Sequence, residues 1–332
     1  MTAEAHKPKS MILGTGSGIP EKIVTNQDLE KIVDTTDEWI RERSGIERRH
    51  ILEEGKANSD LSIIAAEQAL EDAGLKAKDL DVIIVGTVTP DSPFPSTACR
   101  VQAAIGAVKA AAFDISAACS GFLYGIKLAD SMIRSGSARY VLVIGAEILT
   151  RITDWEDRGT CVLFGDGAGA AVLGPSDGTR GILSSYFKSD GRLAHLLHME
   201  AGGSRYPATH ETVDKRMHFI RMEGREVFKH AVRTMSDAAT HALEQAGIHP
   251  DDLDFLITHQ ANIRIIEAIS KRLKLPKDKV FINIQEYGNT SAASIPIALN
   301  QARREGALKD GFRCLLVAFG GGFTWGSALI QF

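Results

Sequence analysis

Two spacings of apolar residues alternate along the chain. In the stretch 59–73 they recur every three or four positions, which predicts a helix that Ser59 would cap and Gly74 would end. The apolar run Asp81–Gly86 follows and predicts a buried strand. The same criteria predict further strands at 113–115, 140–145, 255–258, 280–284 and 314–318, and further helices at 120–134, 227–245, 262–273 and 291–304. This alternation predicts an α/β protein whose buried sheets are covered by helices.

The pattern occurs twice. Residues 69–81 read ALEDAGLKAKDLD and residues 242–254 read ALEQAGIHPDDLD, at an offset of 173 with no gap. At the same offset, Tyr140–Gly145 falls on Arg313–Ala318. Because this period is too long for a solenoid repeat, it indicates domain duplication. We expect a boundary near Pro175–Gly181, which gives an N-terminal half at 1–178 and a C-terminal half at 179–332.

Composition narrows the classes of function. Hydrophobic residues make up 44% of the 332 positions and charged residues 24%, as is typical of a soluble globular protein. The apolar runs fall far short of the roughly 20 residues that a membrane span needs. The first ten residues, MTAEAHKPKS, are expected to form a polar tail without a secretory signal. A net charge of −4 argues against general nucleic-acid binding.

The chain has four cysteines, at positions 99, 119, 161 and 314. Their spacing fits neither a zinc site nor a disulfide framework. Free thiols in a reducing compartment are the simpler interpretation, so we expect the protein in the cytoplasm.

Cys119 is distinguished from the other cysteines by its surroundings. It lies in AFDISAACSG (112–121), where a predicted strand runs through small residues into a helix. Unpaired N–H groups and the helix dipole favour an anion at such a junction, which would lower the thiol pKa and supply a nucleophilic thiolate. A buried structural cysteine is an equally good interpretation of this segment alone. Cys99, Cys161 and Cys314 lie in apolar segments and are expected to be structural.

Two polar residues occupy comparable junctions. His259 follows the predicted strand 255–258, and the carboxyl ends of strands are where α/β sheets place ligands. Asn289 lies in EYGNTSAAS (286–294), which resembles the Cys119 turn in having a strand, small residues and then a helix. Duplication would bring the two turns to one junction. Taken singly, His259 could be an ordinary polar residue and Asn289 a turn residue.

A glycine-rich segment is a further candidate for the site. FGGGF (319–323) comes after a predicted strand and could offer backbone N–H groups to an oxyanion. A phosphate cradle is the competing use, but the P-loop pattern is absent.

These segments together identify the chain as resembling the β-ketoacyl-[acyl carrier protein] synthase III family, from about Met11 to Phe332. The matching motifs are GTGSGIP (14–20), DTTDEWI (34–40), SGIERRH (44–50), AACSGF (117–122), DRGT (157–160), FGDGAGAAVL (164–173), HQANIRI (259–265), GNTSAAS (288–294) and FGGGFTWGSALIQF (319–332). The resemblance implies a thiolase-like fold, with two duplicated α/β halves in an αβαβα layered arrangement.

The resemblance also implies an activity. Cys119, His259 and Asn289 would be the catalytic triad, and Cys119 would take an acyl group, with acetyl the expected starter, from acyl-CoA. The backbone N–H groups of Cys119 and Gly321 would hold the oxyanion. Condensation with malonyl-[acyl carrier protein] would then release CO2 and give a 3-ketoacyl product, without a metal or redox cofactor. Asn289 indicates the initiating class, because elongating synthases carry a second His in its place.

Further contacts are implied by the resemblance. Trp39 and Arg158 would hold the adenine of CoA. The remaining contacts to CoA would come from Thr35, Arg43, Gly224 and Asn262. Phe94, in the proline-rich loop 89–97, would reach into the acyl pocket of a homodimer partner and limit starter size.

A basic edge is predicted on the helix that follows His259. Arg264, Lys271 and Lys274 recur at spacings of seven and three, so they would share one face. We expect this face, with Gln260, to bind the acidic carrier protein. A solvated helix surface is the alternative.

Three other functions remain to be distinguished. A related acyl-CoA-dependent synthase of secondary metabolism, for polyketides or quinolones, would use the same triad. A papain-type cysteine hydrolase also uses Cys, His and Asn, but the duplication disfavours it. A non-catalytic scaffold is disfavoured because all three polar residues are present.

Overall fold

The computed structural model describes residues 9–332, so residues 1–8 of the predicted polar tail lie outside the described part of the chain. Its first sheet has the strand order β1-β7-β6-β4-β5. These strands span Ser10–Gly18 (β1), Asp166–Pro175 (β7), Val141–Ile148 (β6), Val82–Gly86 (β4) and Ala111–Ile115 (β5). β4 pairs with β5 and β6 in parallel, whereas β7 pairs with β6 and β1 antiparallel.

The second sheet repeats this arrangement. Its order is β8-β14-β13-β11-β12, and, as in the first sheet, two antiparallel pairs are followed by two parallel pairs. These strands span Gly181–Ser189 (β8), Thr324–Gln331 (β14), Arg313–Gly320 (β13), Phe255–Thr258 (β11) and Val280–Phe281 (β12). The duplication predicted from the 173-residue offset is therefore present in the topology.

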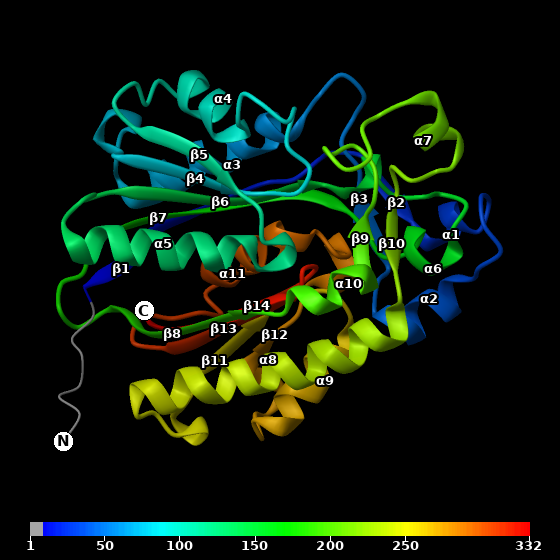
Figure 1. Cartoon of the computed structure of the whole chain (residues 1–332). Helices are drawn as coiled ribbons and strands as arrows, with labels where there is room; N and C mark the ends of the chain where they lie inside the picture. The colour runs from blue at the N-terminus through cyan, green and yellow to red at the C-terminus, as the bar shows by residue number, and fades with distance from the viewer. Residues whose placement is uncertain (1–8) are drawn as a thin grey trace.

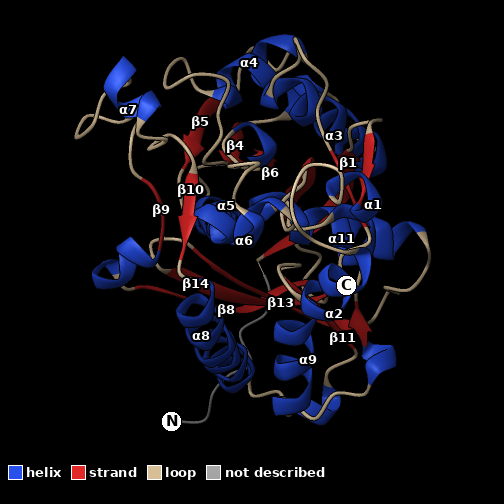
Figure 2. Ribbon diagram, turned by 90° about the vertical axis from the view of Figure 1, so that its right-hand side faces the viewer, coloured by secondary structure: helices blue, strands red, loops and turns tan. Residues whose placement is uncertain are grey.

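Helices and sheets form five layers (Figure 1). Asn58–Ala73 (α3) and Thr97–Ala104 (α4) cover the outer face of the first sheet. Gly121–Ser135 (α5) and Ser294–Arg304 (α11) lie between the two sheets. Gly224–Ala246 (α8) and Ile263–Arg272 (α9) cover the outer face of the second sheet, as Figure 2 shows from the side. The predicted αβαβα arrangement is confirmed.

One hydrophobic core joins the two halves. Buried side chains of β4, β6 and α5 pack in a single cluster with those of β11, β13 and α11. The central helices α5 and α11 carry apolar residues on faces toward both sheets, so each half covers a surface that the other would expose.

Smaller elements lie around this core. The hairpin-like pair Ile23–Thr25 (β2) and Arg48–His50 (β3) and the pair Leu197–Met199 (β9) and Ile220–Met222 (β10) form two small sheets. The short helices are Asn26–Leu29 (α1), Asp37–Ser44 (α2), Arg158–Cys161 (α6), His210–Asp214 (α7) and Ile284–Tyr287 (α10).

Two local predictions are wrong. Ser59 does not cap α3; the helix begins after Ala57, and the Ser59 hydroxyl instead donates to Asp91 at 2.6 Å. The strand predicted at 280–284 ends at Phe281. The Asn283 backbone N–H donates to the Gln260 side chain at 3.1 Å rather than to a neighbouring strand, and α10 starts at the next residue.

None of the helices within residues 9–332 is long and apolar enough to cross a membrane. Within the same range, no group of three or more His, Cys, Asp or Glu side chains is placed to hold a metal ion.

Candidate active site

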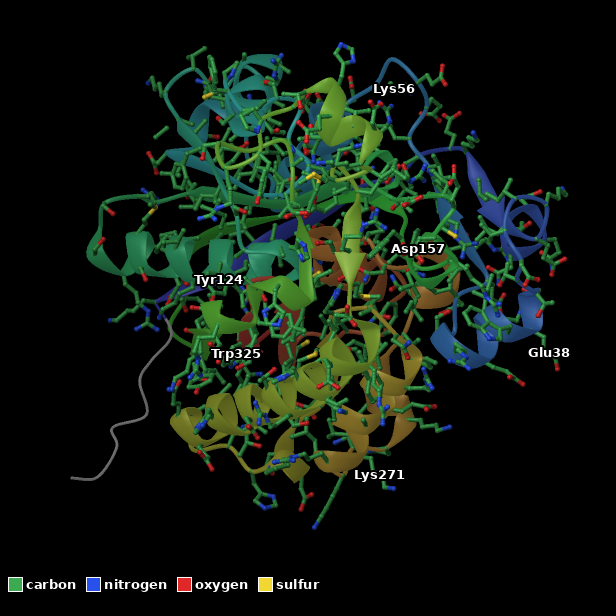
Figure 3. The ribbon with its side chains drawn as sticks, turned by 45° about the vertical axis from the view of Figure 1, so that its right-hand side comes forward. Glu38, Lys56, Tyr124, Asp157, Lys271 and Trp325 are labelled. Carbon is green, nitrogen blue, oxygen red and sulfur yellow. The ribbon has the colours of Figure 1, made fainter. Side chains whose placement is uncertain are left out.

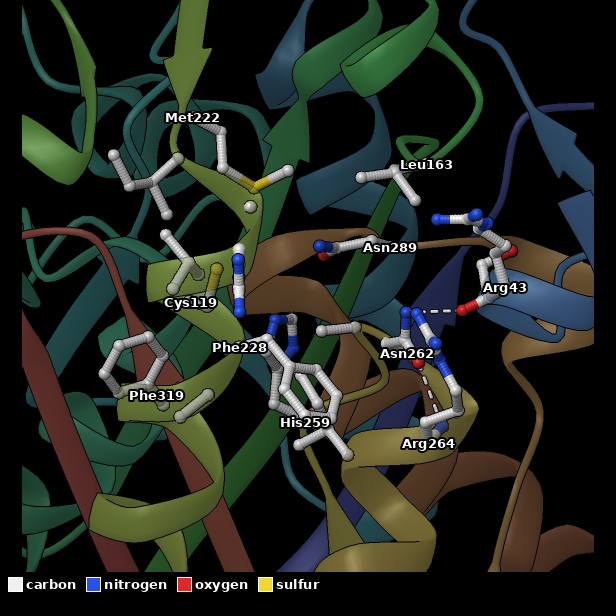
Figure 4. A pocket seen from close by; sticks show the side chains of 18 of the residues that line it. Arg43, Cys119, Leu163, Met222, Phe228, His259, Asn262, Arg264, Asn289 and Phe319 are labelled. Carbon is white, nitrogen blue, oxygen red and sulfur yellow. Dashed lines mark hydrogen bonds between the residues drawn. The ribbon is translucent and has the colours of Figure 1, made fainter.

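A cavity of about 730 Å³ opens between the two halves near α2, α8 and α9. Its walls are mainly apolar and come from distant parts of the chain. They include Val162, Leu163, Phe164, Leu197, Met222, Phe228 and Phe319. Cys119, His259 and Asn289 also line this cavity. Figure 4 shows these three side chains converging at one end of the pocket, with Arg43, Asn262 and Arg264 at the other.

Cys119 lies in a tight turn between β5 and α5. One turn of 3-10 helix, Ala118–Ser120, precedes α5 directly. The turn is fixed against the other half, because the Thr324 hydroxyl donates to the Ala117 carbonyl at 2.8 Å and the Ser120 hydroxyl donates to the Thr324 carbonyl at 3.1 Å. A side chain at Gly320 would place its Cβ 2.5 Å from the Cys119 nitrogen. Glycine is therefore required where the two halves meet at Cys119.

The predicted lowering of the Cys119 pKa is wrong. Burial at the base of the cavity raises the pKa of this thiol to about 12, while a hydrogen bond with the Ser291 side chain acts in the opposite direction. Desolvation thus outweighs the favourable position ahead of a helix N-terminus. The thiol needs a base to become a nucleophile.

His259 follows β11 directly, and its backbone N–H extends the sheet by donating to the Val317 carbonyl at 2.8 Å. Its side chain is buried, and burial lowers its pKa to about 3, so the imidazole is neutral. Nδ1 lies 2.7 Å from the Ser294 hydroxyl oxygen, which also accepts the Gln260 N–H at 3.4 Å. Ser294 can therefore donate its own proton to Nδ1, which leaves the imidazole proton on Nε2.

Asn289 is held at both its backbone and its side chain. Its N–H donates to the Leu163 carbonyl at 2.9 Å, and its carbonyl accepts the Gly165 N–H at 3.1 Å. The side-chain oxygen accepts the Ser291 N–H at 2.9 Å. This bond fixes the orientation of the amide and leaves its NH₂ group free to donate toward the cavity.

The outer end of the cavity carries aromatic and cationic groups. Trp39 and Arg43 lie one turn apart on α2, which Thr36 caps. The guanidinium of Arg158 lies 4.3 Å from the Trp39 ring centroid and that of Arg43 lies 5.1 Å from it. Asn262 caps α9 and donates to the Arg43 carbonyl at 2.8 Å, which joins α9 to α2.

The comparisons with known proteins agree with this geometry. Residues 113–191 match the family model 3-oxoacyl-[acyl-carrier-protein] synthase III, and residues 243–332 match its C-terminal counterpart. The β-ketoacyl-[acyl-carrier-protein] synthase III of Caldanaerobacter subterraneus subsp. tengcongensis is 60% identical over 320 residues, which cover 96% of this chain and 97% of the relative. The chain belongs to the β-ketoacyl-[acyl-carrier-protein] synthase III family.

Solved structures of the family superpose closely. The 3-oxoacyl-[acyl-carrier-protein] synthase III of Aquifex aeolicus VF5 is 50% identical with a TM-score of 0.90, covering 97% of this chain and 100% of that one. The priming β-ketosynthase of the R1128 polyketide pathway is 36% identical with a TM-score of 0.91, covering 98% and 97%. The predicted family, fold and class of enzyme, an acyltransferase that carries out the initiating condensation, are thereby confirmed. The papain-type and scaffold alternatives are excluded.

The structure brings most of the predicted site residues together, but not all. Trp39, Arg43, Gly224, Asn262 and Arg264 line the cavity with Cys119, His259 and Asn289, whereas Arg158 lies over the Trp39 ring and Thr35 is not among the lining residues. Lys271 and Lys274 are exposed, and Figure 3 shows Lys271 pointing away from α9. Phe94 is 84% exposed and lies outside the cavity of its own chain.

The carrier-protein contact predicted for Gln260 is wrong. Its side chain is buried, donates to the Thr258 carbonyl at 2.9 Å and accepts the Asn283 N–H at 3.1 Å. Both ends of the amide are used inside the protein, so Gln260 shapes the turn beneath His259. Cys99 also departs from expectation, since it is exposed on α4 rather than buried.

Three polar residues of the synthase site were missed by sequence reasoning. Ser294 contacts His259, and Ser291 and Glu147 lie behind Cys119. The only signal for Glu147 is an acidic residue inside the apolar run of β6. The two serines lie in the GNTSAAS motif, but their spacing from Asn289 does not reveal which atoms they contact.

Proposed function

We propose that this chain condenses an acyl-CoA, with acetyl-CoA the expected starter, with malonyl-[acyl carrier protein] through an acyl-Cys119 intermediate. The products are a 3-ketoacyl-[acyl carrier protein], CO2 and CoA, in the initiating step of fatty acid synthesis. The observation that carries this proposal is the convergence of Cys119, His259 and Asn289 at one end of an apolar cavity.

The first half-reaction uses the turn around Cys119. The Cys119 sulfur attacks the acyl thioester, and the backbone N–H groups of Cys119 and Gly321 stabilise the oxyanion. The close approach of Gly320 to the Cys119 nitrogen supports this assignment, because it places the 320–322 turn beside the nucleophile.

The second half-reaction uses His259 and Asn289. Their Nε2–H and NH₂ donors bind the malonyl thioester oxygen, so the enolate formed on loss of CO2 is stabilised where its charge develops. A neutral imidazole suits this task, because it donates a hydrogen bond without supplying the proton that would quench the carbanion. The carbanion then attacks the acyl group on Cys119.

The outer end of the cavity is suited to CoA. We assign the adenine to the space between Trp39 and Arg158, whose guanidinium and ring already face each other. We assign further CoA contacts to Thr35 and to Arg43, whose guanidinium lies over the Trp39 ring, and to Gly224 and Asn262, which line the cavity.

Carrier-protein docking is assigned to Arg264, Lys271 and Lys274. All three are exposed on or just after α9, and Arg264 also lines the cavity. An acidic carrier surface bound there would direct its prosthetic arm toward His259.

The proposal also includes the oligomeric state, the division into two halves and the cellular location. The exposure of Phe94 supports a homodimer in which this ring enters the partner's cavity. The change of sheet between β7 and β8 supports a division into halves at 1–178 and 179–332. Four cysteines without disulfides support a cytoplasmic location.

Mass spectrometry after incubation with acetyl-CoA tests the acylation step. We expect an acetyl adduct on Cys119, whereas Cys119→Ser should not accumulate it. Cys161→Ser is a matched control, since that thiol is buried away from the cavity. An adduct on another residue, or its persistence in Cys119→Ser, would refute the assignment.

A second candidate is a starter synthase of secondary metabolism, favoured by the 36% identity to the R1128 priming ketosynthase. Rates with a panel of acyl-CoA starters separate the two functions. A clear preference for acetyl-CoA supports the fatty acid role, and a preference for a longer or branched starter supports the alternative.

A further inference from the structure

Glu147 is a fully buried carboxylate that the condensation chemistry above does not use. It lies near the end of β6, with no exposed surface. Its oxygens accept hydrogen bonds from the Val88 N–H at 3.1 Å, the Thr89 hydroxyl at 2.5 Å and the Thr87 hydroxyl at 3.2 Å. Among residues 9–332 no Lys, Arg or His side chain forms an ion pair with it.

Ser291 connects this carboxylate to the nucleophile. Its hydroxyl donates to Glu147 at 3.1 Å, across 144 positions of sequence. The turn that carries Cys119, Ala118–Ser120, packs against the turn Ser291–Ala293, and the Ser291 side chain acts to lower the pKa of the Cys119 thiol. A hydroxyl has one proton, so when it donates to Glu147 its oxygen can accept the thiol proton. The order of groups is then S–H, O–H and carboxylate.

The duplication shows that the fold does not need these groups. At the offset of 173, Ser291 corresponds to Ala118 and Glu147 corresponds to Gly320. Ala118 and Ser291 have the same left-handed backbone, with φ of 45° and 48°. The equivalent turn and strand end therefore form with neither a hydroxyl nor a carboxylate. The backbone conformation of this turn therefore does not explain why the chain has a hydroxyl and a carboxylate at these two positions.

We propose that Ser291 and Glu147 form a proton relay that removes the proton of Cys119 during acylation and returns it after condensation. The inference rests on the proposed role of Cys119. When the sulfur attacks the acyl-CoA carbonyl, the S–H bond breaks and its proton passes to the Ser291 oxygen. The original Ser291 proton moves to Glu147, and CoA leaves as its thiolate. When condensation expels the Cys119 thiolate, the two transfers run in reverse.

The pKa values of the groups in the site support transfer of the thiol proton to Glu147 rather than to His259. Burial raises the pKa of Cys119 to about 12 and that of Glu147 to about 7. Burial also lowers the pKa of His259 to about 3, which makes it a weak base. Glu147 is therefore the stronger base near the thiol, and it can still be ionised close to neutral pH.

Single-turnover kinetics of Glu147→Gln and Ser291→Ala test the relay. We expect acetylation of Cys119 by acetyl-CoA, followed by mass spectrometry, to slow about a hundredfold in each variant. Alkylation of Cys119 by iodoacetamide should slow in parallel. Release of CO2 from malonyl-[acyl carrier protein] by enzyme fully acetylated beforehand should stay within about twofold, because that step needs no proton from the thiol.

Asp166→Asn is the matched control. Asp166 is also buried and accepts several hydrogen bonds, including one from the Leu52 N–H at 2.8 Å, but it does not line the cavity. Its substitution should leave the ratio of acetylation to CO2 release unchanged. Acetylation at the parent rate in Glu147→Gln and Ser291→Ala would overturn the relay, and so would an equal fall in both half-reactions. Absence of any Cys119 adduct in the parent enzyme would instead overturn the proposed function.

Discussion

The oxygen and the NH₂ group of the Asn289 side chain have different roles. Its oxygen accepts the Ser291 N–H, which leaves its NH₂ group as the donor that faces the cavity. His259 is arranged in the same way, since Ser294 engages Nδ1 and leaves Nε2–H free. In both residues one atom is fixed inside the protein, which leaves the other as a defined donor toward the cavity.

Asn289→Ala removes the NH₂ group and so tests whether this single donor is needed. Loss of a comparable oxyanion donor costs about 2.7–4 kcal/mol, so CO2 release from malonyl-[acyl carrier protein] should fall by about a hundredfold or more. Acetylation of Cys119 serves as the internal control and should change only slightly. CO2 release at the parent rate would contradict the role of Asn289.

The neutral state of His259 has a consequence for stability. Its pKa is about 3 when folded and 6.5 as a free side chain, so between these values only the unfolded chain binds the proton. Acid therefore favours unfolding. Between pH 7 and pH 5 this group should cost the folded state about 2 kcal/mol.

Urea unfolding of the parent and of His259→Gln at pH 7 and pH 5 measures this cost. The parent should lose about 2 kcal/mol relative to the variant on acidification. Taking the difference removes the opposing effect of Glu147, whose raised pKa stabilises the folded state as the pH falls through 7. A difference that does not change with pH would contradict a buried neutral imidazole.

At the scale of elements, the strongly periodic segments were predictable and the irregular ones were not. The helices at 59–73, 120–134, 227–245 and 262–273 form within a few residues of their predicted bounds. The stretch 280–284 is apolar except for Asn283, but only its first two residues pair. Hydrogen bonds from Asn283 to Gln260 and Gln301, both distant in sequence, replace the ladder there.

Helix α9 has one buried and one exposed face. Ile265, Ile266 and Ile269 are buried against the second sheet, while Arg264 and Lys271 are exposed. A charge on the exposed face can therefore be changed without disturbing the core.

Arg264→Glu should weaken docking of the carrier protein. We expect a severalfold or larger rise in KM for malonyl-[acyl carrier protein], growing at low ionic strength, with acetylation by acetyl-CoA nearly unchanged. Lys78→Glu makes the same charge change at an exposed position in the other half and should leave both steps unaffected. Equal effects of Arg264→Glu on both steps would argue against docking.

At the scale of the whole molecule, small residues allow close backbone packing both within the first half and between the two halves. A Cβ at Gly86 would lie 2.7 Å from the Gly121 carbonyl carbon, and a Cβ at Gly145 would lie 2.1 Å from the Ala292 carbonyl oxygen. The offset of 173 maps Gly86 and Gly121 onto His259 and Ser294. Where the first half has close backbone packing, the second half has the hydrogen-bonded pair His259 and Ser294.

Gly145→Ala should therefore strain the contact between the halves. Backbone atoms must move to accept the methyl group, so we expect a loss of about 1–3 kcal/mol or more in the free energy of unfolding. Gly191→Ala is the control, because its Cβ would meet nothing within 4 Å and should change stability by less than about 0.5 kcal/mol. Thermal unfolding measures both, and equal melting temperatures would contradict this account.

The sequence by itself determined the α/β class, the duplication at an offset of 173 and most of the helices and strands that carry the site. Through the family motifs it also predicted the triad Cys119, His259 and Asn289, which the structure brings to one cavity. These features depend on periodicity and on short segments, which are local properties of the chain. Only the tertiary structure decided that Gln260 is buried, that the Cys119 pKa is raised, and that Glu147 lies behind Ser291. Burial and contact between residues 144 positions apart depend on how the two halves pack, and no local pattern encodes that packing.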